Sequence, residues 1–140
     1  MSHDRYLEHL RRVQLFSSCS TRELQRIARV VDEIDVDAGR VLTTEGMIAH
    51  EAFIIVSGEA SVSIQGTEVA TQGPGQQFGV LALLDGGLRT ATVVATSPMT
   101  LLVMTHQAFM SLLDDVPGLA RRVLASMAAR LREADAHVFG

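Results

Sequence analysis

The chain has 140 residues, of which 47% are hydrophobic and 20% are charged, and its formal net charge is −4. This length and apolar content suit one domain, over residues 1–140, with a sizeable hydrophobic core. The negative charge argues against a basic surface for nucleic acid, and the lack of Trp argues against platforms for base stacking. We therefore expect a single domain with no direct DNA binding.

The cysteine content and the N-terminus indicate a cellular compartment. Cys19 is the single cysteine, so an internal disulfide is excluded and a reducing environment fits. The first residues are charged, no signal peptide follows them, and no run of about 18 apolar residues predicts a membrane span. We expect a cytoplasmic protein without a membrane partner.

The first part of the chain, residues 3–32, predicts helices. Apolar residues recur at helical spacing from Tyr6 to Val13. Ser20 and Glu23 have the spacing of a capping box, and an apolar helix face follows from Leu24 to Val31.

The middle of the chain, residues 33–104, predicts short strands separated by glycines. The runs richest in strand-forming residues are 41–44, 53–56, 60–64, 93–95 and 101–103. Val62 and Ile64 alternate with Ser61 and Ser63, as in a half-buried strand. Many short strands with frequent turns are typical of a sandwich or a jelly roll.

The last part of the chain, residues 105–137, returns to a helical pattern. Thr105 is a plausible N-cap for the first of two helices. On the final helix, apolar residues three to four positions apart form a stripe that suits a coiled-coil dimer seam. The same stripe is also compatible with packing on the chain's own strands. Its members are Leu119, Val123, Met127 and Leu131.

One stretch, residues 78–92, combines glycines, a short apolar turn and a lone arginine. Gly79 would let a ligand approach the backbone, and free N–H groups at the start of a helical turn favour an anion. Arg89 could clamp that anion from the other side. The alternative is a β-turn whose arginine is exposed or forms an ion pair with Asp85 or Glu68.

The run Phe78-Gly79-Val80-Leu81-Ala82-Leu83, followed by Arg89-Thr90-Ala91, resembles the phosphate-binding cassette of cyclic-nucleotide-binding domains. This is the family of the catabolite activator protein and the regulatory subunits of protein kinase A. The resemblance extends to Glu45-Gly46 and to residues 53–60. It implies a mainly β fold with flanking helices: an eight-stranded β-roll, or jelly roll, with N-terminal helices and two C-terminal helices.

The resemblance also implies a site. Arg89 would pair with the cyclic phosphate of cAMP, cGMP or another small anion, beside Gly79, the N–H groups of Leu81 and Ala82, and the Thr90 hydroxyl. The sequence departs from the family at Val80, where a glutamate usually accepts a hydrogen bond from the ribose hydroxyl. The positions implied near the ribose and base are Val80, Val69, Ala70, Ala134 and Asp135.

The function implied is a small-molecule-sensing regulatory domain that signals by movement of its C-terminal helix. Many relatives carry a helix-turn-helix module after that helix, but this sequence stops at Gly140. We therefore expect a stand-alone domain, a homodimer and a separate effector protein. The alternative is a degenerate fold without nucleotide that serves as a dimerisation or protein-interaction module.

A metal-dependent enzyme is the remaining class for a jelly roll with histidines. The five histidines are scattered and form no His-x-His pair on a predicted strand. We expect no metal site, no cofactor and no catalytic residues.

Overall fold

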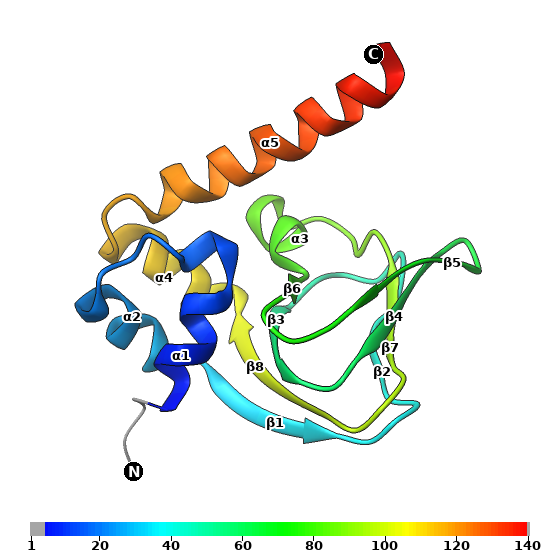
Figure 1. Cartoon of the computed structure of the whole chain (residues 1–140), viewed down its shortest axis with the longest axis horizontal. Coiled ribbons are helices and arrows are strands. Elements are labelled where there is room, and N and C mark those ends of the chain that lie inside the picture. Colours follow the sequence, from blue (N-terminus) through cyan, green and yellow to red (C-terminus); the bar gives the residue numbers. More distant parts are fainter. Residues whose placement is uncertain (1–4, 140) are drawn as a thin grey trace.

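The computed structural model describes residues 5–139, which form helices at both ends of the chain and strands between them (Figure 1). The helical elements are α1 (Arg5–Arg12), η1 (Gln14–Phe16), α2 (Thr21–Ala28), α3 (Val80–Asp85), α4 (His106–Asp115) and α5 (Leu119–Phe139). The strands are β1 (Asp32–Val36), β2 (Val41–Thr43), β3 (Glu51–Ser57), β4 (Ala60–Ile64), β5 (Thr67–Gln72), β6 (Gln77–Phe78), β7 (Thr92–Ala95) and β8 (Met99–Thr105).

Two antiparallel sheets make up the β-roll. Within the described residues each sheet has four strands, in the orders β1-β8-β3-β6 and β2-β7-β4-β5. The first and last strands of the roll pair directly, with Asp32 opposite Val103 and Val36 opposite Met99. The predicted fold class, an eight-stranded roll with flanking helices, is confirmed.

The interior of the roll is a hydrophobic cluster to which both sheets contribute. Phe53 on β3 stacks on Phe78 on β6, with ring centroids 5.0 Å apart. Ile55 and Leu101 join them from the same sheet, and Val93 joins from the other. These buried residues hold the two sheets together around the end of β6, where the cassette begins.

A second cluster lies between the roll and the helices. Strand β3 serves both clusters, because successive side chains on a strand point to opposite faces. Phe53 faces the roll interior, whereas Ala52 and Ile54 face the helices. Leu83 of α3 and Leu119 of α5 are fully buried in this helical cluster. The cassette helix therefore shares a core with the C-terminal helix.

Two helix starts follow the predicted capping chemistry. The Ser20 hydroxyl accepts a hydrogen bond from the Glu23 N–H at 3.1 Å, and the Glu23 carboxylate accepts one from the Ser20 N–H at 2.8 Å. The Thr105 hydroxyl accepts from the Ala108 N–H at 3.1 Å. Both caps satisfy N–H groups that a helix start leaves unpaired.

Most of the stripe on α5 packs on the chain's own core, as the alternative to a dimer seam predicts, and the dimer itself stays a prediction. Leu119 is 0% exposed and Val123 is 3% exposed, because both pack in the helical cluster with η1 and α4. Met127 packs partly against the same cluster, and Leu131 is 66% exposed. Most of the stripe thus covers the chain's own core, as is typical of the apolar face of an amphipathic helix.

None of the helices within residues 5–139 combines the length and the apolar character that crossing a bilayer requires.

Candidate functional site

The candidate site begins where β6 ends and α3 starts. Gly79 has φ +92° and Gly86 has φ +66°, so a glycine in the left-handed region stands on either side of α3. Gly79 is the N-cap and offers no side-chain cap, which leaves the first N–H groups of α3 without a side-chain acceptor.

Gly79 is also required by the close approach of Arg89. A Cβ atom at Gly79 would lie 2.6 Å from Arg89 Nη1 and 3.1 Å from the Glu51 carbonyl oxygen. The guanidinium therefore packs directly on the Gly79 backbone. This contact joins the two ends of the cassette that the sequence analysis identified.

Arg89 is a buried cation whose charge is only partly compensated. It is 7% exposed, and its Nη2 atom lies 4.0 Å from Glu51 Oε1. Its Nη1 atom is buried and has no hydrogen-bond partner among the described residues. Burial lowers the pKa of Arg89 below its ordinary value, and Glu51 opposes that shift. The guanidinium stays charged at neutral pH, since arginine is not deprotonated in proteins.

The ion-pair partner of Arg89 that the structure describes is Glu51, which is not one of the two residues considered from the sequence, Asp85 and Glu68. Glu68 accepts a hydrogen bond from Ser61 instead, and Glu51 takes the place beside Arg89. The Asp85 side chain lies outside the described residues. Glu51 was missed because it is far from Arg89 in the sequence and is brought near only by the pairing of β3 with β6 and β8.

The backbone around Arg89 is held on both sides. The Arg89 N–H donates to the Met47 carbonyl at 2.8 Å, and the Gly46 N–H donates to the Arg89 carbonyl at 2.9 Å. Further along, the Thr43 hydroxyl donates to the Ala91 carbonyl at 3.0 Å. These bonds fix the segment that carries the guanidinium, so that little ordering is needed when an anion binds.

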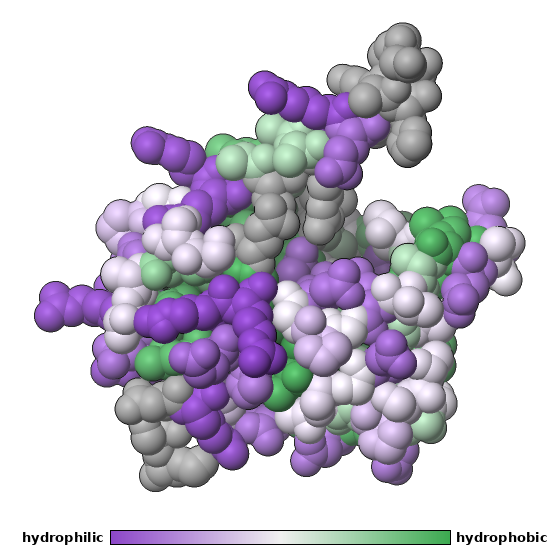
Figure 2. Space-filling view, viewed as in Figure 1, coloured by the Kyte–Doolittle hydropathy of each residue, from purple (hydrophilic) through white to green (hydrophobic). Residues whose placement is uncertain are grey.

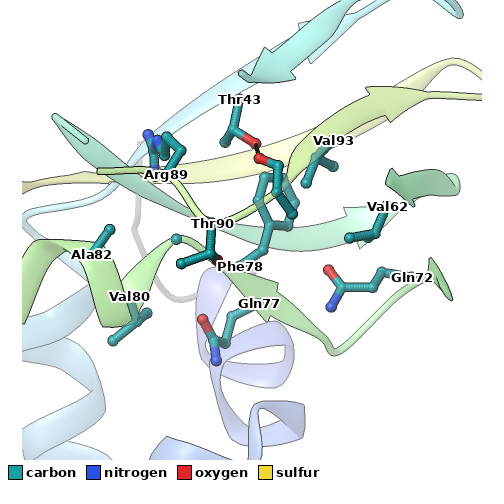
Figure 3. A pocket seen from close by; sticks show the side chains of 12 residues that line it. Thr43, Val62, Gln72, Gln77, Phe78, Val80, Ala82, Arg89, Thr90 and Val93 are labelled. Atoms are coloured by element: carbon teal, nitrogen blue, oxygen red, sulfur yellow. Dashed lines mark hydrogen bonds between the residues drawn. The ribbon is translucent and has the colours of Figure 1, made fainter. Parts of the chain in front are cut away.

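A cavity of about 190 Å³ opens between α3 and the two sheets (Figure 3). It is lined by Thr43, Val62, Gln72, Gln77, Phe78, Gly79, Val80, Ala82, Arg89, Thr90, Ala91 and Val93. The structure thus brings together five of the residues expected at the site: Gly79, Val80, Ala82, Arg89 and Thr90. The side chain of the sixth cassette residue, Leu81, lies outside the described residues.

The residues expected near the base are placed differently. Val69 and Ala70 are exposed on β5 and do not line the cavity. Strand β5 is the edge strand of its sheet, and its residues 67–71 are all exposed. Val69 is 55% exposed, and Figure 2 shows apolar surface over this end of the roll. The side chains of Ala134 and Asp135 lie outside the described residues.

Two glutamines that the sequence analysis did not identify also line the cavity. The Oε1 atoms of Gln72 and Gln77 are buried and have no hydrogen-bond partner among the described residues. No pattern in the sequence marks Gln72, because residues 67–71 are all exposed and only the register of β5 against β4 turns Gln72 toward the roll interior. Val80, by contrast, contributes only an apolar surface.

The described residues form no group of three or more His, Cys, Asp or Glu side chains that could hold a metal ion. The cavity instead is lined by one buried guanidinium, two hydroxyls and two amides. Such a set suits a small anionic ligand that also carries hydrogen-bonding groups. The fold and site together define a β-roll domain with a candidate anion subsite.

Comparison with known proteins identifies the family. The family model of the cyclic nucleotide-binding domain matches residues 33–116, and the chain belongs to this family. It is 33% identical over 117 residues to a cAMP-dependent protein kinase regulatory subunit from Hypocrea atroviridis, covering 84% of this chain and 25% of that protein. It is 36% identical over 112 residues to a Pycsar effector protein from Pseudomonas aeruginosa, covering 78% of this chain and 36% of that protein.

Solved structures agree with this assignment. The catabolite activator protein of Thermus thermophilus superimposes with a TM-score of 0.82 at 27% identity, covering 89% of this chain and 61% of that one. The regulatory domain of Toxoplasma gondii protein kinase A, crystallised with cAMP, gives a TM-score of 0.72 at 32% identity, covering 79% of this chain and 44% of that one. A cyclic AMP receptor protein from Thermus thermophilus is a third relative. The chain spans only a quarter to about half of the length of these three proteins.

Proposed function

We propose that this domain senses a cyclic nucleotide, cAMP or cGMP, and that it does so as a regulatory domain without catalytic residues or a metal. The observation that carries the proposal is the Nη1 atom of Arg89, which is buried against Gly79 at the cavity and has no hydrogen-bond partner within residues 5–139. A phosphodiester anion supplies the missing acceptor. The bidentate geometry of a guanidinium matches two phosphate oxygens.

The cassette completes the phosphate subsite in this proposal. The N–H groups of Leu81 and Ala82 in the first turn of α3 donate to the phosphate oxygens, and the Thr90 hydroxyl lies at the same cavity. A hydrogen bond to a charged group contributes about 1.5–3 kcal/mol. Arg89 therefore accounts for a large part of the affinity.

Val80 sets the expected affinity. A valine cannot accept the hydrogen bond that a glutamate at this position would take from the ribose hydroxyl. The absence of such a bond corresponds to about ten- to a hundred-fold weaker binding. We expect dissociation constants well above those of a domain that carries the glutamate.

The proposed signal passes through the helical cluster. Leu83 of α3 and Leu119 of α5 are buried in the same cluster, and Figure 1 shows α5 running above α3. A shift of α3 on ligand binding would change the packing of α5. The coupling expected for such a two-state shift is about 1–3 kcal/mol.

The proposed partner for the output is a second copy of the chain or a separate effector protein in the cytoplasm. Leu119 and Val123 are buried in the chain's own core. Association through the full stripe on α5 therefore requires this helix to move away from the core. The net charge of −4 supports an output that does not involve direct contact with DNA or an anionic membrane.

Thermal unfolding and calorimetry with cAMP and cGMP test the proposal. A ligand at about 100 times its dissociation constant stabilises the fold by about 2.7 kcal/mol. Arg89→Ala should abolish most of this shift, whereas Arg40→Ala, at an exposed loop position, should keep it. Val80→Glu should tighten binding by about ten- to a hundred-fold.

The same experiment distinguishes the proposed function from the alternative, a degenerate domain that binds no nucleotide. Val80 and the exposed positions of Val69 and Ala70 are the observations that favour a degenerate domain acting as a dimerisation or protein-interaction module. That reading predicts no thermal shift with either nucleotide for the native protein and none for Val80→Glu.

A further inference from the structure

Gln72 is a polar group inside an otherwise apolar part of the cavity. It is the last residue of β5 and lies opposite Ala60 of β4, which is 0% exposed between the sheets. Residues directly opposite each other in an antiparallel pair point to the same face. The Gln72 side chain therefore faces the interior of the roll.

The position of Gln72 complements that of Arg89. Figure 3 places the two side chains on opposite sides of the cavity, with Val62 and Val93 on the side of Gln72. The Gln72 Oε1 atom is buried and has no hydrogen-bond partner within residues 5–139. An unpaired buried carbonyl is costly for the fold, and the residue that carries this one lines the cavity.

Gln77, the other glutamine at the cavity, has a different orientation. It lies opposite Ile54, which packs in the helical cluster, so Gln77 points away from the roll interior. Its neighbours Val13, Leu15 and Phe16 surround a second, small hollow on the helical side. Gln72 is thus the amide that a ligand inside the roll would meet.

We propose that Gln72 is the specificity-determining residue of the site, accepting a hydrogen bond from a donor on the nucleoside part of the ligand. The inference rests on the proposed function, because a phosphate held at Arg89 directs the sugar and base toward the opposite side of the cavity. Val80, on the α3 side of the cavity, offers no hydrogen-bond acceptor. The donors with this chemistry are the ribose 2′-hydroxyl, the amino group of the base and, in cGMP alone, the N1–H group of guanine.

Calorimetry on the full chain tests the assignment. The titrants are cAMP and cGMP, their 2′-deoxy forms, the analogues that lack the exocyclic amino group, and the N1-methyl form of cGMP. Gln72→Leu should weaken binding of the preferred nucleotide by about ten-fold. One analogue lacks the donor that Gln72 contacts, and for that analogue the native protein and Gln72→Leu should bind equally well. The analogue that behaves in this way identifies the donor. Thr71→Val, on the exposed face of the same strand, is the matched control and should bind like the native protein.

A stability measurement distinguishes a ligand contact from a structural role. Replacing an unpaired buried carbonyl with an apolar group removes a desolvation cost, so ligand-free Gln72→Leu should melt at or above the native temperature. Two results would overturn the inference about Gln72 and leave the proposed function intact. The first is native-level affinity of Gln72→Leu for every nucleotide, and the second is a lower melting temperature together with weaker binding of all analogues. A native protein that binds no nucleotide at all overturns the proposed function as well.

Discussion

At the scale of single residues, Gly79 and Arg89 form one unit. Arg89 can lie in the cavity only because Gly79 has no side chain, and Gly79 adopts φ +92° at a position where other residues are strained. A side chain at position 79 would therefore displace the guanidinium. The predicted phosphate cassette therefore depends on a contact between two residues ten positions apart.

The Gly79→Ala variant tests this contact. The positive φ alone should cost about 1–2 kcal/mol of unfolding free energy, and the collision with Arg89 Nη1 should add to that cost and displace the guanidinium. Gly39→Ala is the matched control, because Gly39 has φ +91° and nothing within 4 Å of an added Cβ. Urea denaturation should show the larger loss for Gly79→Ala, and calorimetry should show lost binding only there. Equal losses of stability and intact binding in both variants would contradict the contact.

At the scale of elements, the strand that follows Arg89 is held by side chains as well as by its backbone. The pairing of β2 with β7 is irregular between Val41 and Thr43. Beyond it, the Thr43 hydroxyl donates to the Ala91 carbonyl, and the Glu45 N–H donates to the Thr92 hydroxyl, both at 3.0 Å. These bonds extend the connection between β2 and β7 to the edge of the cavity.

Thr43→Val probes this connection with little change in shape. The variant leaves the Ala91 carbonyl without its donor, which should lower the unfolding free energy by about 1 kcal/mol and weaken nucleotide binding by loosening the segment behind Arg89. Thr44→Val, at the adjacent exposed position, serves as the control and should change neither quantity. Chemical denaturation and calorimetry measure the two effects. A Thr43→Val protein that behaves like Thr44→Val would show that the hydroxyl bond has no role in holding the segment.

At the scale of the whole molecule, the decisive arrangement is the shared helical cluster. The N-terminal helices, α4 and the start of α5 cover one face of β3 and β8, and α3 joins the same cluster. The ligand cavity and the C-terminal helix are therefore connected by packed side chains rather than by a linker. This arrangement supports the proposed signalling route.

Two leucines on α5 test the packing. Leu119→Ala should lower the unfolding free energy by about 2–5 kcal/mol, the usual cost of a large cavity in a core. Leu131→Ala, at a position that is 66% exposed, should change it by less than about 0.5 kcal/mol. Similar losses for both variants in denaturant unfolding would show that the two residues share one environment, as a dimer seam requires.

The sequence by itself determined the features that depend on neighbours along the chain. The capping box of Ser20 and Glu23, the cap at Thr105 and the strands around Phe53, Val62 and Val93 follow from local chemistry and spacing. The cassette from Phe78 to Ala91 is also local, because a turn and the short helix after it need particular residues in a particular order. These signals were sufficient for the fold class and for the cavity-lining positions of Gly79 and Arg89.

The tertiary structure alone decided what strand register and packing bring together. Glu51 beside Arg89 and Gln72 inside the roll come from strands distant from the cassette. A one-residue change of register would point Gln72 to solvent, so no local pattern establishes its place in the cavity. The stripe on α5 is a second feature that the sequence pattern could predict only in part. Apolar spacing predicts that Leu119 and Val123 are covered, but only packing decides that the chain's own core covers them.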